Sequence, residues 1–175
     1  MEKWKIGISS CLLGNKVRYD GNHKLDHFIT ETLGRIFQYV PFCPEVGCGL
    51  SIPREAMHLV GDPSSPHLLT TRTQIDLTER LISYTEATLN SIPSEHLCGF
   101  IFKSKSPSCG LFDTKVITAS NDGPVKRSTG LFAAAFTKKF PLVPVTDEKQ
   151  LQDLPLREKF IEQVFAFSKC QDMKQ

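Results

Sequence analysis

Apolar residues follow two different spacings along this chain, and the two spacings alternate from the N-terminus to the C-terminus. Short, nearly continuous apolar runs are typical of buried parallel strands, and they predict strands over residues 5–10, 38–42, 99–103 and 141–145. Apolar residues at three- and four-residue steps are typical of helices, and they predict helices over residues 24–37, 76–89, 128–138 and 156–168. The pattern therefore predicts strands that alternate with helices.

Other stretches show neither spacing clearly. Residues 50–74 contain several prolines and little period, which predicts a long connection, and such loops are often functional lids or binding loops. Residues 114–118 predict a further short strand, and the segment 121–124 predicts a turn after it. Because the sequence contains no repeat and no interior linker, we expect one domain that spans residues 1–175.

Strands that alternate with helices predict an α/β fold with a mostly parallel sheet and helices on both faces. Sheets of this kind place their functional sites beyond the carboxyl ends of the strands. Cys11 ends the first predicted strand, Cys43 ends the second, and Cys109 lies in the loop after the third. We therefore expect these thiols, which are far apart in the sequence, to gather at one edge of the sheet.

The chain contains six cysteines in 175 residues. Its first residues lead straight into a predicted strand with no signal peptide before it, which predicts a cytoplasmic location. In a reducing compartment, cysteines bind metals or take part in catalysis more often than they form disulfides. We expect Cys98, at the start of the third strand, and Cys170, at the end of the last helix, to pack as small buried hydrophobes.

Charge and hydropathy set limits on the partners. The net charge of +2 is too small to indicate a nucleic-acid or membrane-surface protein. No apolar run approaches the roughly 20 residues of a membrane span, and the 40% hydrophobic content is ordinary for a globular protein. We therefore expect no membrane association and no stable complex with nucleic acid, and the sequence leaves the oligomeric state open.

A turn rich in proline and glycine places Cys43, Cys48 and the carboxylate of Glu45 together. The prolines and glycines restrict the backbone and leave little bulk near the thiols. Glu45 lies close to any metal that Cys43 binds, because only one residue separates them, and it is able to give or take a proton there. Ser106 supplies a hydroxyl from the same loop as Cys109.

Three thiolates that converge on one point suit either zinc or an iron–sulfur cluster. Three-cysteine ligation of a four-iron cluster leaves one iron without a protein ligand, and that iron is a Lewis acid that prefers a soft sulfur atom. Residue types and spacing alone are compatible with both kinds of metal site, and also with cysteines and a serine that only pack or cap.

Longer motifs in the chain resemble a bacterial family formerly labelled a domain of unknown function, which includes the thiouracil desulfidases. The motifs are those at residues 10–14, 17–21, 43–46, 53–55 and 103–110. The segment from Gly130 to the last helix is also similar, so the resemblance covers nearly the whole chain. It implies a Rossmann-like domain with a [4Fe-4S] cluster held by Cys11, Cys43 and Cys109.

The resemblance also implies an enzyme that removes sulfur from a thiolated pyrimidine such as 2-thiouracil. The free iron takes the sulfur, water supplies the new oxygen, and uracil and sulfide form without net redox chemistry. Position by position, Glu45 matches the acid/base carboxylate and Ser106 the assisting hydroxyl. Asp20 and Lys103 are candidates for binding substrate, although turn preference also accounts for Asp20. The implied partner is a small thiolated base or nucleoside.

Cys48 departs from the pattern, since many members of the family carry glycine at this position. It could replace Cys43 as a ligand, add a fourth ligand, or hold a leaving sulfur, and a fourth ligand would close the iron site. The alternative function is a non-catalytic iron–sulfur or zinc-binding module for redox sensing or sulfur transfer. Glu45 and Ser106 favour the enzyme, because a carrier needs neither side chain.

Overall fold

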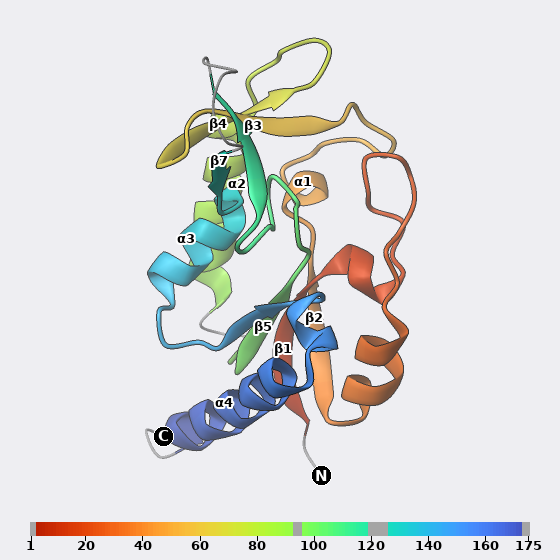
Figure 1. Ribbon diagram of the computed structural model, residues 1–175, viewed down its shortest axis with the longest axis vertical. Helices are drawn as coiled ribbons and strands as arrows, with labels where there is room; N and C mark the ends of the chain where they lie inside the picture. The colour runs from red at the N-terminus through yellow and green to blue at the C-terminus, as the bar shows by residue number, and fades with distance from the viewer. Residues whose placement is uncertain (1–2, 93–95, 119–125, 173–175) are drawn as a thin grey trace.

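The computed structural model describes residues 3–92, 96–118 and 126–172 (Figure 1). Within this part of the chain, the main sheet has the strand order β2-β1-β5-β8, and its neighbouring pairs are parallel. The strands are β1 (Trp4–Ser9), β2 (Phe37–Phe42), β5 (Gly99–Phe102) and β8 (Val145–Asp147). The predicted α/β fold with a mostly parallel sheet is confirmed.

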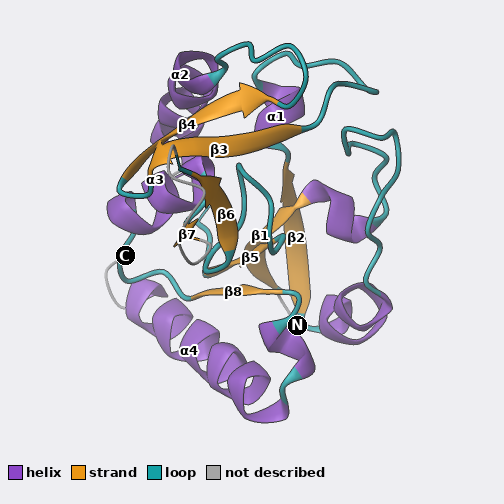
Figure 2. Ribbon diagram, turned by 45° about the horizontal axis from the view of Figure 1, so that its top comes forward, coloured by secondary structure: helices purple, strands orange, loops and turns teal. Residues whose placement is uncertain are grey.

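Helices cover both faces of this sheet. The α-helices in the described residues are α1 (Pro44–Gly47), α2 (Thr78–Ser91), α3 (Leu131–Lys139) and α4 (Leu154–Asp172). Because alternate strand residues point to opposite faces, Ile6, Ile8 and Ile101 share a core with α4, and Phe100 and Phe102 share another with α2 and α3. The two cores hold the sheet between layers of helix (Figures 1 and 2).

A second sheet lies beside the first, with the strand order β4-β3-β6-β7 (Figure 2). Its strands are β3 (Met57–Asp62), β4 (Ser65–Thr70), β6 (Thr114–Ile117) and β7 (Lys126–Ser128). The prediction of residues 50–74 as a connection without strands is therefore wrong. The sequence signal for the β3–β4 hairpin was weak for two reasons. Leu59 and Leu68 are its only fully buried apolar side chains among the described residues. Pro66 is also atypical of a strand, because proline is tolerated only at a sheet edge, where β4 lies.

The predicted helix over residues 24–37 is wrong in type and extent. Residues 28–35 form a π-helical turn followed by a 3-10 turn, and β2 already begins at Phe37. The predicted spacing nevertheless identifies the buried side, since Ile29 and Leu33 are both in the core. The side chain of Phe37, the first residue of β2, is buried as well. The backbone therefore changes from helical to extended between residues 35 and 37.

Two further boundaries differ from prediction. The helix predicted over 128–138 begins at Leu131, because the residues before it pair with β6 as strand β7. The strand predicted over 141–145 begins only at Val145, because prolines in this segment have no N–H to donate to a neighbouring strand. The predicted turn at 121–124 lies outside the described residues. The remaining predicted strands and helices are confirmed to within a few residues.

The carboxyl ends of β1, β2 and β5 lie next to one another, because these strands are parallel neighbours. Each strand runs directly into one of the motifs singled out in the sequence. β1 continues into a 3-10 turn, η1 (Ser10–Leu13), β2 continues through Cys43 into α1, and β5 continues into the loop of residues 103–110. The fold thus brings the motifs together at one edge of the sheet.

Candidate active site

A cavity of about 370 Å³ opens at this edge of the sheet. Its volume lies in the range of small-molecule sites, about 300–1,000 Å³. The structure places Cys11, Cys43 and Cys109 in its wall, together with Glu45 and Ser106. The residues therefore meet as the strand order led us to expect, whereas their roles as ligands and catalysts stay predictions.

Each of the three thiols is set by local backbone structure. Cys11 lies on η1, which ends at Gly14, a residue in the left-handed region with a φ of 88°. Cys43 is the N-cap of α1, and Pro44 takes the first helical position, where its missing N–H costs nothing. The N–H of Cys109 donates to Ser106 Oγ at 3.1 Å, which closes a tight loop.

Glycine is required beside Cys109. A Cβ on Gly110 would lie 2.0 Å from Thr114 Oγ1 and 2.7 Å from the carbonyl oxygen of Ser106. A Cβ on Gly130 would lie 2.6 Å from the backbone of Ser108. These close approaches explain why the third motif and the start of α3 both contain glycine, and they hold the loop of Cys109 against that helix.

Cys11 and Cys109 are buried, Cys43 is partly buried, and the three thiols influence one another. Burial raises the pKa of Cys11 to about 11, against a smaller lowering by the charge of Lys103. Burial also raises the pKa of Cys43 and of Cys109, and for Cys109 the charges of Cys43, Glu45 and Cys11 add to the rise. At neutral pH the thiols therefore keep their protons unless a bound cation replaces them.

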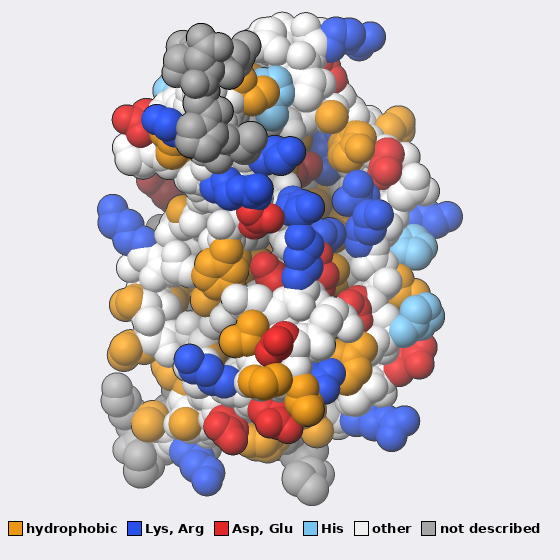
Figure 3. Space-filling view, in the orientation of Figure 1, with side chains coloured by type: hydrophobic (Ala, Val, Ile, Leu, Met, Phe, Trp, Pro, Cys, Tyr) orange, Lys and Arg blue, Asp and Glu red, His pale blue; other side chains and the backbone are white. Residues whose placement is uncertain are grey.

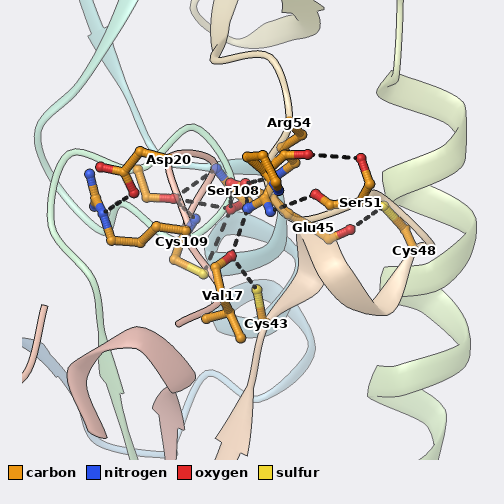
Figure 4. A network of polar contacts seen from close by, with 12 residues as sticks. Val17, Asp20, Cys43, Glu45, Cys48, Ser51, Arg54, Ser108 and Cys109 are labelled. Atoms are coloured by element: carbon orange, nitrogen blue, oxygen red, sulfur yellow. Dashed lines mark hydrogen bonds and ion pairs between the residues drawn. The ribbon is translucent and has the colours of Figure 1, made fainter. Parts of the chain in front are cut away.

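The carboxylate of Glu45 is held at both oxygens (Figure 4). Arg54 donates to Oε2 from Nε at 3.0 Å and also from Nη2, and Ser108 donates to Oε1 from Oγ at 2.8 Å. The side chains of Glu45 and Arg54 are only 12% and 6% exposed. Charge-assisted bonds of this kind fix the direction in which the carboxylate faces.

Ser106, the predicted hydroxyl, does not contact Glu45 directly. Its Oγ accepts from the N–H groups of Cys109 and Ser108 and lies 3.0 Å from Ser108 Oγ. Because Ser108 gives its single proton to Glu45, Ser106 donates to Ser108, and the hydroxyls form a chain that ends at the carboxylate. Sequence reasoning missed Ser108 and Arg54, although both belong to the motifs that it used.

Asp20 and Lys103, the predicted substrate-binding residues, lie in different settings. Asp20 is on an exposed turn, where Oδ1 accepts from the N–H of Asn22 at 3.1 Å and pairs with Arg18 at 3.4 Å, and it is not among the described residues that line the cavity. Lys103 does line the cavity, but its ammonium is bound to Glu148 at 2.5 Å. Neither residue's contact with substrate is tested by this arrangement.

The other cysteines lie away from the cavity lining. Cys48 donates from Sγ to the carbonyl oxygen of Glu45 at 3.2 Å, and Figure 4 shows it on the far side of Glu45 from Cys109. Cys98 is buried in the core, as expected. Cys170 is exposed on α4, so its predicted burial is wrong.

The three thiols line one cavity without forming a site for a single metal ion. In the described part of the chain, no three side chains of His, Cys, Asp or Glu are close enough to hold one metal ion. Basic side chains gather around this hollowed face (Figure 3). A neighbouring cavity of about 200 Å³ shares Lys105 with the first and adds Lys115 and Arg127. In the lining of the first cavity, basic residues outnumber acidic ones, with Arg18, Arg54, Lys103 and Lys105 against Glu45.

An α/β domain that gathers thiols and a fixed carboxylate at the carboxyl ends of its strands has these groups where enzymes of this fold place their active sites. Comparison with known proteins makes the class specific. A family model described as 2-thiouracil desulfurase matches residues 6–148. The chain therefore belongs to the 2-thiouracil desulfurase family, and both the predicted family and the predicted class of enzyme are confirmed.

A solved structure supports this assignment, and a further relative is similar in sequence. A solved structure described as the [4Fe-4S]-dependent thiouracil desulfidase TudS is 29% identical, with a TM-score of 0.67, and the match covers 90% of this chain and 99% of that one. The uncharacterized protein YbbK of Bacillus subtilis (strain 168) is 32% identical over 127 residues, which cover 66% of this chain and 83% of YbbK.

Across the described residues, no helix has the length and apolar character needed to cross a membrane.

Proposed function

We propose that this protein is a cytoplasmic, single-domain desulfidase that removes sulfur from a thiolated pyrimidine, such as 2-thiouracil, and releases uracil and sulfide without net redox change. The observation that carries the proposal is that three thiols, two of them buried and that of Cys43 partly buried, line one small cavity together with the fixed carboxylate of Glu45. The family and the likeness to a thiouracil desulfidase support the same reaction.

Cys11, Cys43 and Cys109 would hold a [4Fe-4S] cluster. The residues fit this group, because soft thiolate donors surround a cavity and a cluster spans more space than a single ion. Cys48 lies outside the cavity lining, which favours a cluster with one iron open to substrate. When bound, the cluster supplies a Lewis acid that accepts the soft sulfur of the thiolated base.

Glu45 is the proton carrier in this proposal. Hydrolysis of the carbon–sulfur bond requires that water lose protons and that the departing sulfur gain them. Glu45 takes each of the two protons that water loses and passes it to the sulfur, so water becomes the carbonyl oxygen of uracil, the sulfur leaves as hydrogen sulfide, and the protonation of Glu45 is unchanged after one turnover. Arg54 and Ser108 hold the carboxylate in one orientation, and Ser106 reaches it through Ser108.

The substrate in this proposal is a thiolated base or nucleoside. The cavity of about 370 Å³ has to hold the cluster as well as the reacting ring, and a pyrimidine is small enough to share it. The soft sulfur of the substrate binds iron better than the harder oxygen of the product, which favours release of uracil.

Anaerobic reconstitution tests the proposal. Protein loaded with iron and sulfide is incubated with 2-thiouracil, and uracil and sulfide are measured alongside the metal content. Equal amounts of uracil and sulfide are expected from the unmodified chain and from Cys170→Ser, and none from Cys109→Ser. A loaded cluster with no release of sulfide indicates a sulfur carrier or redox sensor, and zinc alone indicates a structural module; either result overturns the proposal.

A further inference from the structure

A second, partly buried ion pair borders the cavity, separate from the pair of Arg54 and Glu45. Lys103 Nζ lies 2.5 Å from Glu148 Oε1, and the two side chains are 17% and 15% exposed. Lys103 Nζ also donates to the carbonyl oxygen and the hydroxyl of Ser104, at 3.0 and 3.3 Å. Ser104 in turn donates to Glu148 from its N–H at 2.8 Å and its hydroxyl at 2.6 Å. Both charges are therefore held in place.

The pair has a fixed direction relative to the thiols. Lys103 follows β5 and lines the cavity, whereas Glu148 follows β8 and is not among the lining residues. The backbone N–H of Lys103 donates to Ser9 Oγ at 2.9 Å, which ties it to the strand that leads to Cys11. Of the charges around the Cys11 thiol, that of Lys103 has the largest effect and that of Glu148 a smaller, opposite one.

Neither substrate binding nor stability accounts well for this arrangement. The three N–H groups of Lys103 each have a protein acceptor, so a ligand could bind the ammonium only by displacing one of these contacts. A buried ion pair is weak support for stability, because removing two charges from water costs about as much as their attraction returns. The pair does, however, place the positive charge of Lys103 at the cavity that the thiols line. The negative charge of Glu148 balances it, so the net charge of the protein does not change.

We propose that Lys103 and Glu148 are positioning residues that set the electrostatic potential at the cluster site, and thereby the reduction potential of the cluster that Cys11 helps to hold. This inference rests on the proposed function, since it needs the cluster. Net charge and nearby dipoles are among the factors that set cluster potentials. Lys103 favours the extra negative charge of the reduced cluster, and Glu148 limits that effect. A reaction without net redox change requires a cluster that stays in one oxidation state.

Single and double variants test the pair through the reduction potential. Reconstituted Glu148→Gln is expected to have a more positive potential than the unmodified chain, because the charge of Lys103 is then unbalanced. Lys103→Met is expected to shift the potential in the negative direction, and the double variant to lie between the two. Lys138→Met, an exposed charge on α3, is the matched control and should leave the potential unchanged.

Shifts of opposite sign separate this role from a structural one, because damage to the fold moves both single variants in the same direction. Shifts of one sign, or no shifts, overturn the inference. If Lys103→Met does not fold, the reduction potential of the double variant must still be more negative than that of Glu148→Gln. If the unmodified chain assembles no cluster, the proposed function fails and the inference fails with it. An active, loaded chain whose variants keep its potential refutes the inference alone.

Discussion

Arg54 and Cys43 share one acceptor, the backbone carbonyl oxygen of Val17. Arg54 Nη2 donates to this oxygen at 3.0 Å, and the Cys43 thiol lies 4.0 Å from it (Figure 4). A thiolate ligand has no proton to donate, so cluster binding removes the contact of Cys43 and leaves that of Arg54. Arg54 therefore keeps the loop of Val17 attached to the site whether or not Cys43 is ligated.

Replacement of Arg54 is expected to separate stability from catalysis. Arg54→Ala leaves Glu45 buried without its partner, and we expect a loss of about 3–5 kcal/mol in the free energy of unfolding, measured in urea. Arg54→Lys keeps the charge but not the planar fork, so it retains most of the stability while kcat falls by about 100-fold. Equal stability of Arg54→Ala and the unmodified chain would contradict this view of the pair.

Ser108 is expected to matter more directly to Glu45 than Ser106 does. Ser108→Ala removes the donor to Glu45 Oε1 and should lower kcat/KM by about 100-fold, with little change in melting temperature. Ser106→Ala removes the acceptor of the Cys109 N–H and should also lower the iron content. Ser64→Ala, in the β3–β4 hairpin, is the control. Full activity of Ser108→Ala would remove this hydroxyl from the proton path.

Cys48 is expected to be dispensable for cluster binding. Its thiol lies outside the cavity lining and donates to the carbonyl oxygen of Glu45. Cys48→Ala should therefore retain the iron and acid-labile sulfide of the unmodified chain, whereas Cys11→Ser and Cys43→Ser should lose most of both. A marked loss of iron from Cys48→Ala, in a folded protein, would show that Cys48 is a ligand.

The metal-free protein is expected to lose stability in alkaline solution. Burial raises the pKa of Cys11 from 9.0 to about 11, so between these values the unfolded chain has released a proton that the folded chain retains. The free energy of unfolding should fall over this range by at most about 1.4 kcal/mol per pH unit for this thiol. Urea unfolding at several pH values measures it, and Cys11→Ser should show a shallower fall.

Elements were predictable from the sequence where apolar residues recur at a regular spacing because one face of the element is buried. Strands β1, β2 and β5 and helices α2 to α4 each bury a continuous face, so their spacing shows in the sequence. The β3–β4 hairpin buries little beyond Leu59 and Leu68, and its edge strand even contains Pro66, so no clear period marks it. The helix predicted over 24–37 failed because the burial of Phe37 in β2 outweighs local helical spacing.

The sequence by itself determined the alternation of strands and helices, and with it the gathering of Cys11, Cys43 and Cys109 at one edge of a parallel sheet. Only the tertiary structure decided which side chains act on one another there. Glu45 and Ser108 are 63 residues apart, and Lys103 and Glu148 are 45 apart. Strand order places such residues in the same region, but hydrogen-bond partners depend on side-chain directions that no spacing in the sequence encodes.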